Sequence, residues 1–154
     1  MSPNTIYTYG YTSASPADLK AYIDALDAYL IDVRYSPRSR VPQWRQQALD
    51  EMAGVTAHGR RRYRHIIELG NVNYNSDGPI ELYAPAAGLR EIAPYLAARP
   101  CILLCACADW RLCHRRVVAD LIVEAAALAG DGMIGVEHLP ARFREWQVGT
   151  GVAL

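Results

Sequence analysis

Two cysteines, Cys105 and Cys113, together with His114 and Arg115, are the side chains of this 154-residue chain best placed to do chemistry. A thiolate is a good nucleophile, and nearby arginines or a helix amino terminus lower the pKa of a cysteine into the reactive range. Histidine exchanges protons near neutral pH and can act as an acid or base beside a thiol. We therefore take Cys105, Cys113 and His114 as candidate catalytic residues and Arg115 as a candidate substrate-binding residue.

Other interpretations of the cysteine cluster stay open. Cys105 also fits the buried last residue of a strand, because unpaired cysteine packs well in protein cores. Cys105, Cys107, Cys113 and His114 offer zinc-compatible side chains, but their spacing differs from that of common structural zinc sites, so we assign no metal ligand. A reversible disulfide of Cys113 with Cys105 or Cys107 is a further alternative. The Cys-x5-Arg spacing from Cys105 to Arg111, which thiol phosphatases share, is too short a pattern to decide between these.

A second group of polar residues follows the short apolar run at 29–33. A carboxylate at the end of a buried strand must be paired or must bind a ligand, because an unpaired buried charge is costly. We expect Asp32 either to take part in catalysis or to form a structural ion pair with Arg34. Guanidinium and hydroxyl groups that suit phosphate binding come from Arg34, Ser36, Arg38, Ser39 and Arg40.

The elements that must position these groups alternate between strand and helix. Apolar runs and alternating patterns predict strands at 5–9, 29–33, 63–69, 101–105 and 133–138. Helical spacing and capping residues predict helices at 16–26, 42–53, 88–98 and 112–129, with a kink at Pro94 and a last helical turn at 141–146. This order predicts an α/β fold: a single Rossmann-like three-layer domain over residues 1–154, with a mostly parallel sheet of four or five strands.

Both polar groups directly follow predicted strands. In an open parallel sheet, ligands bind where the strands end at the carboxyl edge. The amino terminus of the helix after residue 112 would face the same edge and favour an anion. We therefore expect one cleft, with Asp32 and the arginines after it on one side and Cys105, Cys113, His114 and Arg115 on the other.

The charge of the chain is balanced overall but unevenly distributed. Sixteen basic residues face sixteen acidic ones, and residues 33–64 hold eight arginines but only two acids. Because Lys20 is the only lysine, the basic patch consists of arginine, whose planar fork suits bidentate recognition of phosphate. A general compositional bias towards arginine explains this equally well. The patch from Arg34 to Arg64 makes a nucleic-acid-binding or regulatory module an alternative to an enzyme.

The sequence also indicates where the protein works. No apolar run approaches the roughly 18 residues of a membrane-spanning helix, and the amino terminus lacks the features of a secretory signal. All four cysteines fall within 101–113, unlike the dispersed cysteines of a disulfide framework, so reduced thiols are expected. We expect a cytoplasmic protein without membrane partners.

The two motif blocks resemble the bacterial family catalogued as domain of unknown function 488. Residues 30–34 and 37–40 are similar to its Asp-Val-Arg…Pro-x-Ser-Arg block, and residues 104–106 and 113–115 to its Leu-Cys-Ala…Cys-His-Arg block. The resemblance extends over nearly the whole chain and implies a Rossmann-like domain of unassigned activity. The chain departs from the family at Tyr11, where relatives often carry histidine, and at Cys107, where they often carry an acid.

Together these patterns predict an intracellular enzyme, a thiol- or acid/base-dependent hydrolase or transferase. Its expected partner is an anionic small molecule or nucleotide, or a nucleic-acid end, held in an Arg/Cys/His cleft. A non-catalytic nucleic-acid-binding or regulatory module is the alternative, and a zinc- or redox-responsive cysteine cluster is a second one. The sequence identifies no cofactor.

Overall fold

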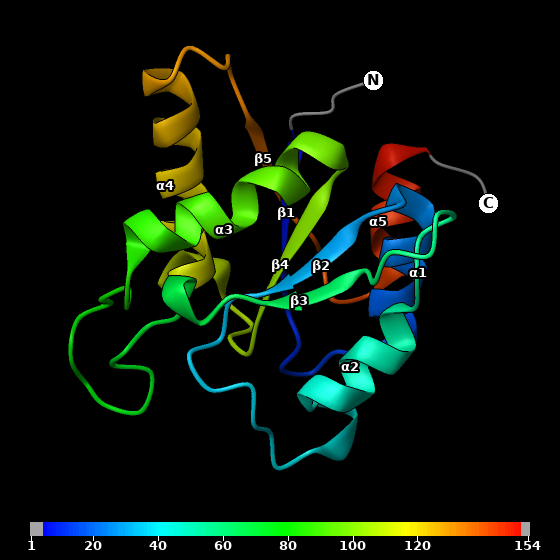
Figure 1. Ribbon diagram of the computed structural model, residues 1–154. Helices are drawn as coiled ribbons and strands as arrows, with labels where there is room; N and C mark the ends of the chain where they lie inside the picture. Colours follow the sequence, from blue (N-terminus) through cyan, green and yellow to red (C-terminus); the bar gives the residue numbers. More distant parts are fainter. Residues whose placement is uncertain (1–4, 152–154) are drawn as a thin grey trace.

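Five parallel strands form the centre of the protein (Figure 1). The structure is a computed structural model that describes residues 5–151. The strands are β1 (Thr5–Gly10), β2 (Tyr29–Asp32), β3 (Tyr63–His65), β4 (Cys101–Cys105) and β5 (Gly135–His138). They lie in the order β3-β2-β4-β1-β5, and every neighbouring pair is parallel.

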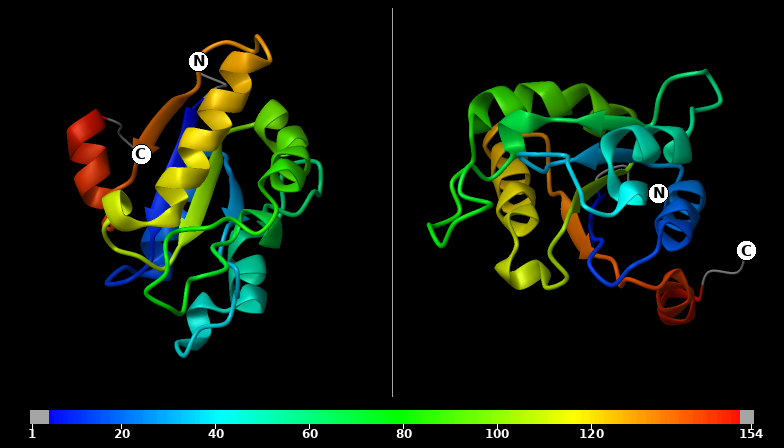
Figure 2. Two further views of the ribbon diagram at one scale, coloured as in Figure 1. Left: turned by 90° about the vertical axis from the view of Figure 1, so that its left-hand side faces the viewer. Right: turned by 90° about the horizontal axis from the view of Figure 1, so that it is seen from below.

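Helices cover both faces of the sheet and give three layers (Figure 2). The helices are α1 (Pro16–Leu26), α2 (Gln46–Ala53), α3 (Pro85–Ala98), α4 (His114–Leu128) and α5 (Phe143–Thr150). Three short 3-10 turns are η1 (Pro42–Trp44), η2 (Ile67–Leu69) and η3 (Trp110–Leu112). This arrangement confirms the expected α/β class and the Rossmann-like three-layer architecture.

Alternation along the strands divides the core into two apolar clusters, because successive side chains of a strand point to opposite faces. Ile102 and Leu104 of β4 join the cluster beneath α1, α2 and α5. Leu103 and Cys105 join the cluster beneath α3 and α4, which also contains Cys113. The strand pattern therefore directs Cys105 towards the start of α4.

The structure differs from the expected elements in several places. The predicted helix 42–53 divides into η1 and α2, and the last helical turn is the longer helix α5. The predicted strand 63–69 ends at His65, because its single neighbour β2 ends at Asp32 and offers no longer ladder. Pro94 does not interrupt α3, since it lies on the exposed side of the helix, where water can reach the carbonyl group that proline leaves unpaired. The predicted helix 112–129 divides into η3 and α4, with Cys113 at the N-cap of α4.

The position of β4 between β1 and β2 creates a switch point at the carboxyl edge of the sheet. The chain leaves β1 and β2 towards α1 and α2 on one face, but it leaves β4 towards α4 on the other face. Such switch points are where open α/β sheets bind ligands. The ends of three neighbouring strands therefore meet where both polar groups of the sequence lie.

Gly10, the last residue of β1, allows the chain after β4 to approach closely. A Cβ atom at this position would overlap the main-chain oxygen of Cys107 and the guanidinium of Arg115. The hydrogen bonding between the two segments continues past Gly10, because the Tyr11 N–H donates to the oxygen of Cys105 at 3.1 Å. A residue with a side chain at position 10 cannot occupy this place without moving the cysteine loop.

Within residues 5–151, no helix combines the length and the apolar character needed to cross a membrane.

Candidate functional site

A pocket of about 260 Å³ opens at the carboxyl ends of β1, β2 and β4. Arg34, Ser36 and Arg38 of the first motif block line it, and so do Cys105 and His114 of the second. None of the residues that line this pocket, all of them in the described part of the chain, is acidic. The fold therefore brings the two blocks together in one cavity with basic and thiol side chains.

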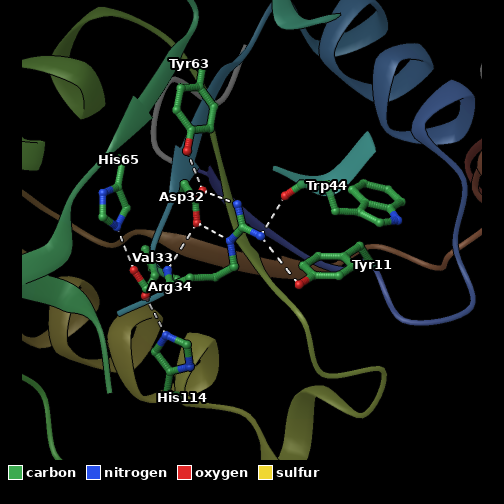
Figure 3. Close-up of polar contacts among 8 residues, drawn as sticks. All are labelled: Tyr11, Asp32, Val33, Arg34, Trp44, Tyr63, His65 and His114. Atoms are coloured by element: carbon green, nitrogen blue, oxygen red, sulfur yellow. Dashed lines mark hydrogen bonds and ion pairs between the residues drawn. The ribbon is translucent and has the colours of Figure 1, made fainter. Parts of the chain in front are cut away.

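Asp32 and Arg34 form a bidentate ion pair beneath this pocket (Figure 3). Arg34 donates from Nε to Oδ1 at 2.8 Å and from Nη2 to Oδ2 at 2.6 Å. Both residues are buried, and the hydroxyl of Tyr63 donates to the second oxygen of the same carboxylate. Burial and the charge of Asp32 raise the pKa of Tyr63, which keeps the phenol protonated as a donor. Asp32 thus holds Arg34 in place and does not itself line the pocket.

The remaining donors of Arg34 organise the wall of the pocket. Nη1 donates to the main-chain oxygen of Trp44 at 2.8 Å and to the hydroxyl of Tyr11 at 3.4 Å (Figure 3). The rings of Tyr11 and Trp44 stack with centroids 4.7 Å apart. The loop after β2 and the loop after β1 are therefore tied to the same guanidinium.

Two histidines hold consecutive carbonyl groups at the end of β2. His114 Nε2 lies 2.7 Å from the oxygen of Val33, and His65 Nε2 lies 2.7 Å from the oxygen of Arg34 (Figure 3). A carbonyl oxygen only accepts, so each Nε2 carries the hydrogen. In neutral His114 the lone pair is then on Nδ1, which lies 3.9 Å from Cys113 Sγ. Burial lowers the pKa of His114 and favours this neutral form.

Cys105 and Cys113 are joined as a disulfide in this structure, which is one of the alternatives left open above and differs from the expected reduced thiols. This contact leaves Cys101 and Cys107 as the free cysteines. Cys101 is a core residue, buried in the sheet. This burial raises the pKa of its thiol to about 12. Cys107 is exposed and lines the pocket mouth.

Arg115 lies directly under the floor of the pocket and is 2% exposed. Its Nη1 donates to Cys105 Sγ at 3.6 Å and to the main-chain oxygen of Cys107, and its Nε donates to Thr8 Oγ1 at 3.2 Å. No carboxylate within residues 5–151 forms an ion pair with it. Burial lowers the pKa of Arg115, and the nearby Cys107 and Asp109 oppose this shift without reversing it. A buried guanidinium charge therefore faces the sulfur of Cys105.

Thr8 connects Arg115 to the edge strand β5. Thr8 Oγ1 lies 2.6 Å from His138 Nδ1, and the ring of Trp110 stacks on that of His138 with centroids 3.8 Å apart. Sequence reasoning did not select Thr8 or His138, because no motif joins residues 130 positions apart. Thr8 binds the Nε of Arg115, and His138 in turn binds Thr8.

The structure brings some sequence-predicted residues into the pocket and leaves others outside. Ser39 and Arg40 do not line it; Ser39 Oγ accepts from the N–H of Val41 at 3.1 Å and shapes the loop instead. Arg111 is exposed and binds Asp109 at 3.0 Å, so the Cys-x5-Arg spacing does not form a phosphate loop here. Asp32, Cys113 and Arg115 lie behind the residues that line the cavity.

Part of the pocket wall comes from residues that the sequence did not indicate. Tyr35 follows Arg34, and Asn71 and Tyr74 come from the long loop between η2 and α3. The rings of Tyr35 and Tyr74 lie 5.9 Å apart. The turn residues of this loop predicted only irregular structure. Gly70 packs against the main chain of Tyr35, where a Cβ atom would overlap it.

The fold and the site together define a three-layer α/β protein with a basic, cysteine-containing pocket at the switch point of its sheet. The model of the family described as "Domain of unknown function DUF488" matches residues 80–122. This segment includes β4 and the second motif block, so the match supports the predicted resemblance to this family over that part of the chain, while the first block lies outside it. The comparisons with curated proteins and with solved structures found no match.

Proposed function

We propose that this protein is an enzyme that binds a phosphate-bearing small molecule, such as a nucleotide, and acts on it beside Cys105 and His114. The observation that carries the proposal is the shared pocket, in which Arg34 and Arg38 face the cysteine and histidine of the second block. In the reduced protein, a hydrolytic or group-transfer reaction fits this arrangement best, because the Cys105 thiol and the His114 imidazole then lie next to an anion site.

The charges around the pocket favour an anionic ligand. Arg34 is balanced by Asp32, but Arg38 is exposed and has no hydrogen bond or ion pair with any residue between 5 and 151. Arg115 adds a second unbalanced charge under the floor. α4 begins at His114, so its positive amino terminus points to the same place. These positive groups act together on a cavity that has no acidic lining residue.

Aromatic and amide groups favour a ligand that is larger than free phosphate. Tyr35 and Tyr74 present rings to the pocket, and flat rings stack well on nucleobases and sugars. Asn71 Oδ1 accepts from the main-chain N–H groups of Asn73 and Glu81, each at 3.0 Å, which fixes the orientation of its amide. A nucleotide would use the aromatic side and the basic side of the cavity at once.

The nucleic-acid-binding alternative receives less support from the second part of the basic patch. Arg61, Arg62 and Arg64 form ion pairs with Asp50, Asp27 and Glu91, respectively. The guanidinium of Arg60 lies 5.3 Å from the ring centroid of Tyr95. Because these arginines already have partners, they offer less free positive charge to a phosphate backbone.

The same proposal places the protein in the cytoplasm, where nucleotides and phosphorylated metabolites are available and where thiols are kept reduced.

Thermal unfolding with AMP, adenosine and inorganic phosphate tests the proposal. We expect AMP to raise the melting temperature more than adenosine or phosphate, because only AMP would use the aromatic side and the basic side of the cavity at once. A ligand at about 100 times its Kd stabilises the folded protein by about 2.7 kcal/mol. Arg38→Ala should remove most of the shift. Arg90→Ala, an exposed arginine on α3 outside the pocket, is the matched control. If no compound raised the melting temperature, or if both variants lost the shift equally, the pocket would not be an anion site.

A further inference from the structure

Three potential metal ligands meet at the floor of the pocket. The sulfur atoms of Cys105 and Cys113 and a ring nitrogen of His114 all lie within 4.8 Å of one another. All three residues are buried, and the start of α4 and the end of β4 hold them from two sides. No other cluster of at least three histidine, cysteine or acidic side chains in residues 5–151 has this geometry.

The orientation of His114 is the one that metal-binding histidines adopt. Such histidines donate the hydrogen of one ring nitrogen to a carbonyl or carboxylate group, which leaves the other nitrogen as the ligand. His114 donates from Nε2 to Val33, so its Nδ1 lone pair is on the side of Cys113. This hydrogen bond fixes the ring before any ion binds.

The spacing of the two cysteine backbones also fits a bridging ion. Their Cα atoms are 7.8 Å apart, whereas disulfides usually span about 4.4–6.8 Å. A permanent disulfide would need the backbones to move together. Two metal–sulfur bonds of about 2.3 Å each reach further than one sulfur–sulfur bond and fit the wider spacing.

We propose that Cys105, Cys113 and His114 bind a zinc ion when the two cysteines are reduced. Two thiolates and one imidazole are the ligands that zinc prefers, and they exclude magnesium and calcium, which require oxygen ligands. Binding converts two thiols to thiolates and releases two protons, while the ion contributes two positive charges. Arg115 donates to Cys105 Sγ and stabilises that sulfur as a thiolate.

The site leaves a coordination position on the side of the pocket. Cys105 and His114 line the cavity, so an ion held by them would be open to a bound molecule or water. Three protein ligands with one open position are typical of catalytic zinc, which activates water and polarises phosphoryl oxygens. The inference goes beyond the proposed function and needs no bound nucleotide, so either one can fail without the other.

Cobalt(II) titration of the reduced, metal-free protein tests the site. We expect one equivalent to bind and to give a thiolate-to-cobalt charge-transfer band with the visible bands of a tetrahedral ion. Cys105→Ser and Cys113→Ser should weaken binding more than about a hundredfold, since loss of a supporting partner alone costs 10–100-fold. Cys107→Ser is the matched control, because this cysteine neighbours the cluster but is exposed and outside it.

Circular dichroism shows whether each variant is folded, and X-ray absorption of the zinc-loaded native protein counts its sulfur ligands without any substitution. Two sulfurs and at least one imidazole would support the site. Absence of a charge-transfer band in the reduced protein, or an equal loss of affinity in Cys107→Ser, would overturn it. The AMP melting shift of the metal-free protein is recorded in parallel, so a failed nucleotide site is distinguished from a failed metal site.

Discussion

His114 donates a hydrogen bond to the main-chain oxygen of Val33, 81 positions earlier in the chain, at 2.7 Å. This contact fastens the start of α4 to the end of β2. It joins the two motif blocks directly, so the position of the cysteine cluster depends on the loop that carries Arg34 and Arg38. The pocket is therefore built as one unit, and substitutions in either block are expected to affect the other.

Asp32→Ala is expected to destabilise the protein by about 3–5 kcal/mol, because it leaves the buried guanidinium of Arg34 without its counter-ion. Urea unfolding measures the change in free energy of unfolding. Asp24→Ala is the control: Asp24 pairs with Lys20 at 3.1 Å but is exposed, so its loss should cost at most about 1 kcal/mol. Equal costs for the two variants would show that the buried pair has no special role.

Gly10→Ala is expected to destabilise the protein by about 1–3 kcal/mol or more, since the new methyl group overlaps the main chain at Cys107. Gly149→Ala provides the opposite case. Gly149 lies within α5, and a methyl group added there would meet no other atom within 4 Å, so alanine should stabilise the helix by up to about 1 kcal/mol. Thermal unfolding of both variants checks the pair, and a neutral Gly10→Ala would contradict the close approach.

The four cysteines should react with an alkylating reagent at very different rates. Cys107 is exposed and should be labelled first. Cys101 should remain unlabelled in the native protein even at pH 9, because with a pKa of about 12 only about one thiol in a thousand is ionised there. Mass spectrometry of peptides after timed labelling locates each adduct. Fast labelling of Cys101 under native conditions would show that the sheet is open at this strand.

Acidification should destabilise the protein partly through His138. Burial is the main cause that lowers the pKa of His138 below 6.5, and Arg115 and Arg116 lower it further while Asp120 opposes them. A group with a lowered pKa binds fewer protons in the folded state, so stability falls as pH drops below about 6.5.

His138→Gln should therefore show a smaller loss of stability between pH 7 and pH 5 than the native protein. Urea unfolding at a series of pH values gives the comparison. His58→Gln, at an exposed position, should follow the native curve. Parallel curves for the native protein and His138→Gln would mean that His138 titrates normally in the folded protein.

The sequence predicts the strands and helices well where the pattern is local and strong. The buried run 101–105 and the helix from Pro16 to Leu26 are examples, since hydrophobic periodicity and capping residues determine them. The order of the strands is not predictable in this way. It depends on which apolar faces pack together after crossovers, and no residue pattern in β4 indicates that it lies between β1 and β2.

The site was predictable only in part for the same reason. Asp32 and Arg34 are close in sequence, so their pairing was one of two expected outcomes. The burial of Arg115 was not expected, because arginine at the start of a helix usually reaches solvent, whereas here Thr8 and Cys105 surround it. The position of Tyr74 was not predictable, because its loop has no periodicity and its ring is placed by contact with the ring of Tyr35.

The pocket draws its walls from four separate stretches of chain: Tyr11, residues 34–38, residues 71–80 and residues 105–114. No contiguous fragment contains them all, and the segment 80–122 lacks the arginines of the first block. A split or truncated version of the protein would consequently lose ligand affinity even where its remaining secondary structure survived. Ligand binding thus offers a reporter of the completed tertiary topology, more stringent than helix content.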